Sequence, residues 1–355
     1  MADRETPCFV LEEQKLRQNL SLLKQIERET DIHILHTLKS FHQEEGTEII
    51  ASQLSGFSIS NLTEYQSIAH LPNQQIHSYA PVLFPNEIER LASISDTLSF
   101  NSLSQWESLV EQVTDHTSVG LRINPALPLK QPDYCNPTLS TGRLGVPSHT
   151  FLNHYHHDEN FASQVEGLHF HLFCNQGFDA LEKLLSYLTT HYHPILPKLR
   201  WLNLGGGQNL THRDYPIEKL ITALKQFSQR YPNLTLYLEP GSSVLHNCGY
   251  FETTIVDIIE TDEANIALLD TSIETHLLDI AITKQRPTVR NASQKGRYKY
   301  ELTGISCIAG DSLGEYRFDT PLQIGERIVL ENMLGYTLVK QTEFNGIGRA
   351  KFYLV

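Results

Sequence analysis

The chain has 355 residues and a formal net charge of −13, with 40% hydrophobic and 19% charged residues. This balance is typical of a folded globular protein, and the acidic excess argues against nucleic-acid binding, which needs a basic surface. It is compatible with a cationic substrate. No apolar stretch has the length that spans a bilayer, and the N-terminus lacks the pattern of a secretion signal. We therefore expect a cytoplasmic protein that binds neither nucleic acid nor a membrane.

The first elements predicted along the chain are a short N-terminal strand, a helix that begins near Leu11, and a buried strand over 31–41 that ends in Lys39. Further strands are predicted over 56–60, 75–81, 97–102, 118–125, 165–173, 199–207 and 234–241. Helical patterns over 61–70, 86–93, 102–113, 179–190 and 216–231 lie between most of them. Strands that alternate with helices predict parallel β/α units, and about eight such units favour a closed barrel.

The pattern changes after Gly241. Strands without long intervening helices are predicted over 251–262, 265–272, 299–306, 326–333 and 336–346. The sequence thus predicts an α/β chain, with a TIM-like (β/α)8 barrel over 11–240. A C-terminal, mostly β domain is expected over 241–355, together with the N-terminal strand over 1–10.

The five cysteines are odd in number, widely spaced and without a Cys-x-x-Cys pair. They are Cys8, Cys135, Cys174, Cys248 and Cys307. This arrangement indicates neither a disulfide framework nor a structural zinc site.

The stretch "GLHFHLFC" over 167–174 places two histidines one residue apart in an apolar run. On a strand, His169 and His171 would point to the same face. They could then bind one metal ion, lie against a flat cofactor, or be core histidines that bond to backbone carbonyls. The residues by themselves leave all three interpretations open.

Three other features could carry chemistry. Lys39 is either an amine suited to form a Schiff base or a surface lysine at a strand end. Gly205–Gly207 follow a strand and are either a phosphate-binding loop or a tight turn. Glu239 ends the next strand, where it could hold a pyridine nitrogen protonated, cap a helix or pair with an arginine.

With these residues in order, the chain resembles the fold-type III pyridoxal-phosphate decarboxylases, the alanine racemase-like barrel enzymes that include ornithine and diaminopimelate decarboxylases. Within them it is most similar to the carboxynorspermidine/carboxyspermidine decarboxylase group. The motifs that carry the resemblance are "TPCFVLE", "HTLKSF", "STGRLGVP", "GLHFHLFC", "WLNLGGGQNLT", "LEPGSSV", "LDTSIETHLLD", "SCIAGDSLGEYRF" and "YTLVKQTEFNGI".

The resemblance implies pyridoxal 5'-phosphate as the cofactor, with Lys39 as its Schiff-base lysine and His171 as the imidazole stacked on its ring. His169 keeps the core interpretation. Gly205, Gly206 and Gly207 would bind the phosphate, with Tyr336 nearby. Glu239 would contact the pyridine nitrogen, close to the bound substrate.

The resemblance also implies a homodimer with shared active sites, because Cys307 and Asp311 match a segment that family dimers present to the neighbouring site. Cys307 is a candidate acid for returning a proton to Cα, and Asp311 a candidate substrate contact. Asp279, and after it Asp270 and Glu274, would hold the cationic arm of the substrate.

Two positions depart from family patterns. Ser242 follows Glu-Pro-Gly, where the amino-acid decarboxylases have an arginine, and Asn175 stands where a glutamate is expected. The expected reaction is the decarboxylation of carboxynorspermidine and/or carboxyspermidine to norspermidine or spermidine. The alternatives are a diaminopimelate or other basic amino-acid decarboxylase, a metal-dependent barrel hydrolase, and a non-catalytic pyridoxal-phosphate carrier.

Overall fold

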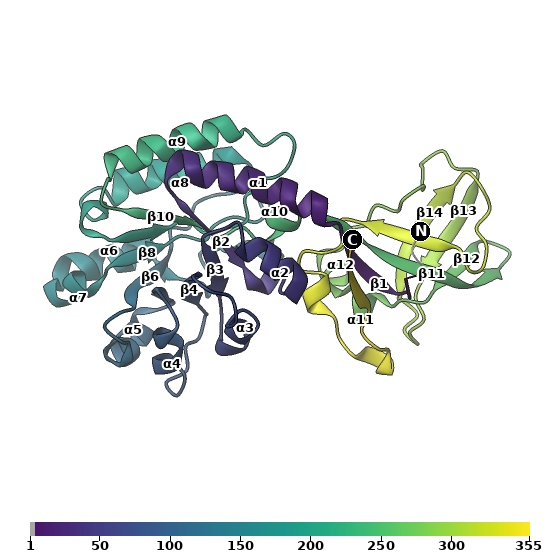
Figure 1. The fold of residues 1–355 in the computed structure, drawn as a ribbon, viewed down its shortest axis with the longest axis horizontal. Helices are drawn as coiled ribbons and strands as arrows, with labels where there is room; N and C mark the ends of the chain where they lie inside the picture. The colour runs from purple at the N-terminus through teal and green to yellow at the C-terminus, as the bar shows by residue number, and fades with distance from the viewer. Residues whose placement is uncertain (1–3) are drawn as a thin grey trace. The chain divides into compact units, whose positions relative to one another are not determined.

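The computed structural model describes residues 4–355, which divide into two compact units (Figure 1). One unit consists of residues 19–244, and the other combines the residues up to 18 with 245–355. Among the described residues, no helix is both long enough and apolar enough to cross a membrane.

Residues 19–244 form a closed barrel of parallel strands. In order around the barrel these are β5 (Thr97–Phe100), β4 (Gln75–Tyr79), β3 (Gly56–Ile59), β2 (His33–Thr37), β10 (Thr235–Leu238), β9 (Trp201–Asn203), β8 (Gly167–His169) and β6 (Ser118–Asn124). Pairing between β5 and β6 closes the ring. A two-residue strand, β7 (Val146–Pro147), pairs in parallel with the C-terminal end of β6 and is not part of the ring. The predicted eight-stranded barrel is confirmed.

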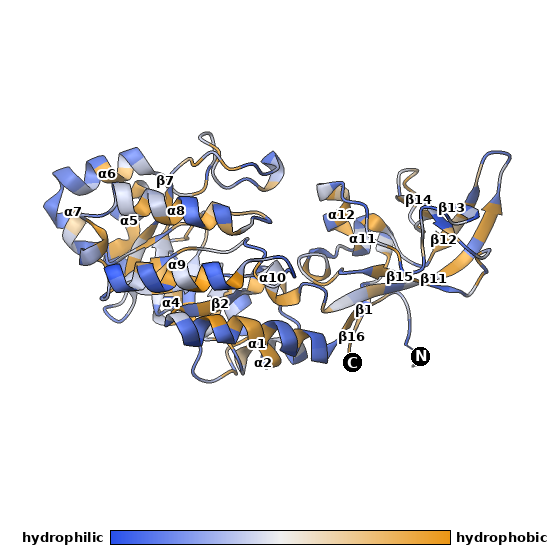
Figure 2. Ribbon diagram, turned by 90° about the horizontal axis from the view of Figure 1, so that it is seen from above, coloured by the Kyte–Doolittle hydropathy of each residue, from blue (hydrophilic) through white to orange (hydrophobic). Residues whose placement is uncertain are grey.

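Helices connect the strands and cover the barrel (Figure 1). They are α1 (Glu13–Thr30), α2 (Glu44–Ala51), α3 (Leu62–Gln66), α4 (Ile88–Ser93), α5 (Leu103–Leu109), α6 (Ser148–His157), α7 (Glu159–Gln164), α8 (Phe178–His191), α9 (Ile217–Arg230) and α10 (Ser242–Leu245). Short 3-10 turns are η1 (Leu38–Ser40), η2 (Val110–Gln112), η3 (Asp133–Cys135) and η4 (Leu196–Lys198). Figure 2 shows polar and apolar stretches along α1, α8 and α9, as expected of helices with one buried face.

Burial in α1 explains why this segment is helical. Leu16, Leu20, Leu23 and Ile26 recur at helical spacing and are completely buried. Helices α6 and α7 were not predicted, because many histidines and polar residues weaken their apolar pattern. Phe151 and Phe161 are nevertheless buried in them.

The second unit is built on a mixed sheet, and a mostly β second domain was expected. The strands follow the order β14 (Ser312–Phe318), β13 (Tyr298–Thr303), β12 (Asn265–Leu269), β11 (Gly249–Glu260), β1 (Cys8–Leu11) and β16 (Lys351–Leu354), and β15 (Arg327–Glu331) also pairs with β11. Two short helices, α11 (Ile273–His276) and α12 (Leu278–Thr283), follow β12.

The strand predicted over 336–346 is wrong. This segment contains two 3-10 turns, η5 (Leu338–Lys340) and η6 (Phe344–Gly346). Left-handed backbone at Tyr336 and Asn345, with φ of 62° and 57°, interrupts any extended run there. The sequence analysis also missed strands β14 and β16.

The structure contains a disulfide that the cysteine pattern did not indicate. Cys135 and Cys174 are bonded, with their Cα atoms 6.1 Å apart and a sequence separation of 39. Cys135 lies in the loop after β6, and Cys174 lies in the segment after β8. Because β6 and β8 are neighbours in the barrel, their following segments meet.

Candidate active site

The predicted cofactor residues of the barrel unit follow four neighbouring strands. Lys39 follows β2, Glu239 follows β10, Gly205–Gly207 follow β9, and His171 follows β8. The strands β2, β10, β9 and β8 are consecutive in the barrel. One stretch of the barrel's C-terminal rim, where barrel enzymes carry their active sites, therefore holds the whole set.

Lys39 lies in the 3-10 turn η1, directly after β2. Its side chain keeps access to solvent, but the protein atoms around the amine lower its pKa below the usual value. The Glu239 carboxylate opposes this effect, and the Arg122 guanidinium adds to it. A lowered pKa increases the fraction of neutral, nucleophilic amine, as carbonyl chemistry requires.

Glu239 is a buried carboxylate with polar partners on both oxygens. Asn203 Nδ2 donates to its Oε1 over 2.8 Å, His77 Nε2 lies 3.8 Å from Oε1, and His169 Nε2 lies 3.5 Å from Oε2. Burial by itself would raise the pKa of this carboxyl, but the imidazoles, His169 first, hold it well below its usual range. Glu239 therefore carries a negative charge inside the barrel.

The sequence analysis missed Asn203 and His77 as residues of this site. Asn203 Oδ1 also accepts from the Gly205 amide over 2.8 Å, so one side chain connects Glu239 to the glycine loop. His77 is completely buried, and its Nδ1 lies 2.7 Å from Thr97 Oγ1. The available signal was a histidine in β4 and an asparagine at the end of the apolar strand β9.

His171 lies just beyond the strand that carries His169, so strand alternation does not by itself fix its direction. Strand β8 ends at His169, and the two rings lie 6.3 Å apart at 87°. The His171 Nδ1 accepts a hydrogen bond from the Gly206 amide over 3.1 Å. Burial, together with Lys39 and Arg122, holds the pKa of His171 well below its usual value, so the ring is neutral.

Metal coordination by the His-x-His pair does not fit this geometry. Among the described residues, the buried group close enough to share an ion is His77, His169 and Glu239, without His171. His169 also differs from a core histidine bonded to backbone carbonyls, because neither of its ring nitrogens has a hydrogen-bond partner among the described residues and its Nε2 lies 3.5 Å from Glu239 Oε2.

Arg122 is a further site residue that the sequence analysis missed. It lies in β6 and is buried, with its guanidinium 4.6 Å from the centroid of the Tyr79 ring. Its NH2 donates to the His171 carbonyl over 3.1 Å. A buried arginine in an apolar strand is uncommon, and this charge was visible in "SVGLRINP".

The three glycines let the β9 loop approach its neighbours closely. A Cβ on Gly206 would lie 1.9 Å from the Glu239 carbonyl oxygen, and one on Gly207 would lie 2.0 Å from that of Phe173. The amides of Gly205 and Gly206 already have partners within the protein. A phosphate would therefore draw on Gly207 and the residues that follow it.

The two departures from family patterns have local structural correlates. Asn175 has a left-handed backbone with φ of 51°, which asparagine adopts more readily than glutamate. Ser242 begins the short helix α10. Beside it, Ser243 Oγ donates to the Gln208 carbonyl and accepts from the Leu210 amide, which fastens the segment after the glycine loop.

The remaining predicted residues lie in the second unit. Asp270 accepts from Thr253, Thr254 and Thr6, Asp311 from the amides of Ile273 and Ser306, and Glu274 from Ser272. Asp279 pairs with Lys340, whose amine lies 5.3 Å from the centroid of the Tyr336 ring. Cys307 is exposed and has a free thiol.

These contacts separate the predicted acidic residues into two kinds. Asp270 and Asp311 use both carboxylate oxygens to hold neighbouring segments. The Asp279 partner is a lysine side chain, which a substrate cation could replace. The substrate role of all these residues stays a prediction.

Comparison with known proteins identifies the family. A family profile described as "Pyridoxal-dependent decarboxylase, C-terminal sheet domain" matches residues 113–333. A carboxyaminopropylagmatine decarboxylase from Synechocystis is 38% identical over 96% of this chain and 88% of that protein. The chain belongs to the pyridoxal-dependent decarboxylases.

Two further comparisons agree with this membership. A carboxynorspermidine/carboxyspermidine decarboxylase from Campylobacter jejuni is 37% identical over 97% of this chain and 91% of that protein. The crystal structure of a carboxynorspermidine decarboxylase from the same species, complexed with norspermidine, has a TM-score of 0.90 and 35% identity. It covers 99% of this chain and 94% of that one. This decarboxylase is thus similar to the carboxynorspermidine/carboxyspermidine decarboxylases, the group that its sequence motifs indicated.

The rim residues fit pyridoxal phosphate, the cofactor of this family. The ionised Glu239 suits a protonated ring nitrogen, the neutral His171 ring offers a flat apolar face, and Lys39 supplies an amine with a lowered pKa. Gln208 follows the glycine loop and is buried, and no partner for its side-chain amide is found among the described residues. It is a further candidate donor to a phosphate.

We predict that this decarboxylase loses stability in mild acid. Burial lowers the pKa of His36 to about 4 and that of His77 to about 3, against 6.5 for an ordinary histidine. Between pH 6.5 and 4 the unfolded chain binds protons that the folded chain does not, so its free energy of unfolding falls as pH falls. Urea unfolding at pH 7.5, 6 and 5 measures the slope.

In a His36→Gln variant the free energy of unfolding should depend less steeply on pH, although the variant is less stable. The reason is that it lacks one imidazole that takes up a proton on unfolding. The matched control is His157→Gln at an exposed position, which should keep the slope of the unmodified protein. Equal slopes in all three proteins would show that buried neutral histidines are not the cause.

Proposed function

We propose that this decarboxylase removes the carboxylate of carboxynorspermidine and/or carboxyspermidine, which gives norspermidine and/or spermidine. The observation that carries the reaction type is the buried, ionised Glu239 on the same rim as Lys39 and His171. The names of the relatives that match nearly the whole chain support the substrate class.

The cofactor, when bound, supplies an electron-poor ring that accepts the electron pair left behind as CO2 departs. Glu239 would keep a proton on the ring nitrogen, which preserves the pull on those electrons. The hydrogen bond from Asn203 orients Glu239, and His169 lies beside its other oxygen. His171 would lie against one face of the ring, and its hydrogen bond from Gly206 fixes the plane of the imidazole.

Lys39 would hold the cofactor through its amine. Its lowered pKa raises the fraction of neutral amine, the form that can attack the aldehyde carbon of the cofactor. Cys307 is the proposed acid that returns a proton to Cα, since its thiol is exposed and free to donate.

A second candidate substrate is carboxyaminopropylagmatine, after which the 38% identical relative is named. All three candidates share a carboxylated aminopropyl end and carry positive charge in the rest of the molecule. They differ at the distal group, which is an amine in two of them and a guanidine in the third. The rim residues act on the shared end, so the distal contacts decide between them.

Asp279 is the proposed partner of the distal cation. In the structure its carboxylate is paired with the amine of Lys340, which shows that this position accommodates a primary ammonium group. The substrate cation would replace Lys340 there. Asp279 would thus set the affinity for the substrate rather than the rate of the chemical step.

The test of the function is CO2 release from carboxynorspermidine, carboxyspermidine, carboxyaminopropylagmatine and diaminopimelate by the protein loaded with pyridoxal phosphate. We expect the first two to have the highest kcat/KM and diaminopimelate the lowest. For Asp279→Asn we expect KM to rise about tenfold, the equivalent of about 1.4 kcal/mol, with a smaller change in kcat.

The matched control is Asp319→Asn, an exposed aspartate of the same unit, which should leave KM unchanged. A preference for diaminopimelate would overturn the proposed substrate class. An unchanged KM in Asp279→Asn would exclude the proposed contact with the distal cation.

We also propose that the enzyme is a homodimer in which Cys307 serves the partner's active site. In that case Lys39→Ala and Cys307→Ala should each be nearly inactive, and mixing them should restore about a quarter of the unmodified activity. Half of the randomly formed dimers are mixed, and each mixed dimer has one intact site of two. Activity that stays at the level of the separate variants would contradict shared sites.

A further inference from the structure

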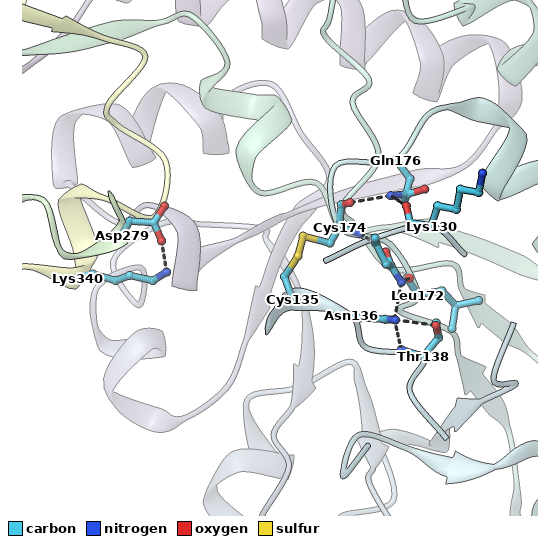
Figure 3. Close-up of a disulfide and its surroundings, with 10 residues drawn as sticks. Lys130, Cys135, Asn136, Thr138, Leu172, Cys174, Gln176, Asp279 and Lys340 are labelled. Carbon is cyan, nitrogen blue, oxygen red and sulfur yellow. Dashed lines mark hydrogen bonds and ion pairs between the residues drawn. A yellow bond between two sulfur atoms is a disulfide. The ribbon is translucent and has the colours of Figure 1, made fainter. Parts of the chain in front are cut away.

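The disulfide joins two segments that lie beside the predicted cofactor site. Cys135 is at the end of η3, in the long loop between β6 and β7, and Cys174 is three residues after His171. Figure 3 shows the bond next to the hydrogen bonds of Asn136 and Gln176. Both cysteines are partly exposed.

Hydrogen bonds fasten the same two segments independently of the sulfur atoms. Gln131 accepts from the Cys174 amide over 3.0 Å and donates to the Leu172 carbonyl over 3.0 Å. Gln176 donates to the Lys130 carbonyl over 3.2 Å. Opening the disulfide would therefore loosen the connection without releasing the loop completely.

The segment that carries Cys174 is also connected to the cofactor residues. The Gln176 amide donates to the Gly207 carbonyl over 2.9 Å, and Gly207 packs against the Phe173 carbonyl so closely that a Cβ would lie 2.0 Å from it. His171 belongs to the same segment and accepts from Gly206. A change at Cys174 therefore reaches both His171 and the glycine loop.

We propose that Cys135 and Cys174 form a reversible redox pair that controls how well the rim holds its cofactor. The closed disulfide fixes the segment 171–176 in the geometry described above. The open dithiol gives this segment and the loop 127–139 more freedom, which weakens cofactor binding. This inference rests on the proposed role of His171, but not on the identity of the substrate.

The chemistry is a thiol–disulfide exchange with a cellular dithiol. One thiolate of the dithiol attacks Cys135 or Cys174, which breaks the S–S bond, forms a mixed disulfide and releases the other cysteine as a thiolate that takes up a proton. The second thiol of the dithiol then displaces the first cysteine. The enzyme gains two electrons and two protons, and the dithiol becomes a disulfide. The reverse reaction closes the bond.

The exposure of the pair supports exchange at this position. Cys8 and Cys248 are buried, where a protein dithiol has no access, whereas both sulfur-bearing residues of the pair are partly exposed. Exposed disulfides are in general easier to reduce than buried ones.

The first measurement counts thiols in the full-length holoenzyme. Denaturation with an alkylating agent and no reductant should label Cys8, Cys248 and Cys307 only, and treatment of the native protein with dithiothreitol should add Cys135 and Cys174. Peptide mass spectrometry identifies the labelled residues. Labelling of all five cysteines after treatment of the native protein with a disulfide oxidant would overturn the proposal.

The second measurement compares the oxidised and reduced enzyme without any mutation. On reduction, the dissociation constant for pyridoxal phosphate should rise about three- to tenfold, because an ordered site binds better than a loosened one. Trypsin should cleave faster after Lys130 in the reduced enzyme and at an unchanged rate after the exposed Lys295, which lies in the other unit. Equal cofactor affinity and equal cleavage after Lys130 in both forms would contradict the proposal that the redox state of the pair controls cofactor binding.

Variants connect these responses to the pair. Cys135→Ser and Cys174→Ser should each behave as the reduced enzyme under all conditions, and Cys307→Ser, an exposed cysteine outside the pair, should keep the full redox response. A redox response that persists in Cys135→Ser would contradict the assignment. These readouts are cofactor affinity, thiol count and cleavage, so they stay decisive even if none of the candidate substrates is decarboxylated.

Discussion

The site depends on a carboxylate that stays ionised inside the barrel. An isolated buried charge is strongly unfavourable, and the low dielectric that makes it so also strengthens every polar contact around it. Asn203 donates to Glu239 directly, and the imidazoles of His77 and His169 lie on its two sides. Because these groups come from strands β4, β8 and β9, they surround the buried charge only once the barrel has closed.

The same constraint explains the protonation states of the neighbouring residues. Burial favours the neutral form of histidine and the ionised form of Glu239 is favoured by its partners, so the rim combines neutral rings with one negative charge. Arg122 supplies positive charge beside the same residues. This distribution suits a cofactor with a protonated ring nitrogen, an aldehyde carbon and a phosphate.

Much of this could be predicted from the sequence, because strand ends converge in a barrel. Lys39, His171, Gly205–Gly207 and Glu239 each lie near the C-terminal end of a predicted strand, and the closed strand order brings them to one rim. Arg122, His77 and Asn203 were missed because each lies inside a strand, where a polar residue has no local pattern to mark its partner. The Cys135–Cys174 bond was missed for a related reason. The two cysteines are 39 positions apart in sequence, and they meet only because their loops follow neighbouring strands of the barrel.

The measurement that tests the central claim most directly is the position of the cofactor on the chain. The protein is reconstituted with pyridoxal phosphate, reduced with borohydride and digested, and the pyridoxyl group is located by mass spectrometry. We predict that the absorption band near 420 nm, typical of the cofactor bound to a lysine, disappears on reduction, and that the label is found on Lys39. A label on another lysine, or no label at all, would contradict a cofactor site on the rim formed by β2, β8, β9 and β10.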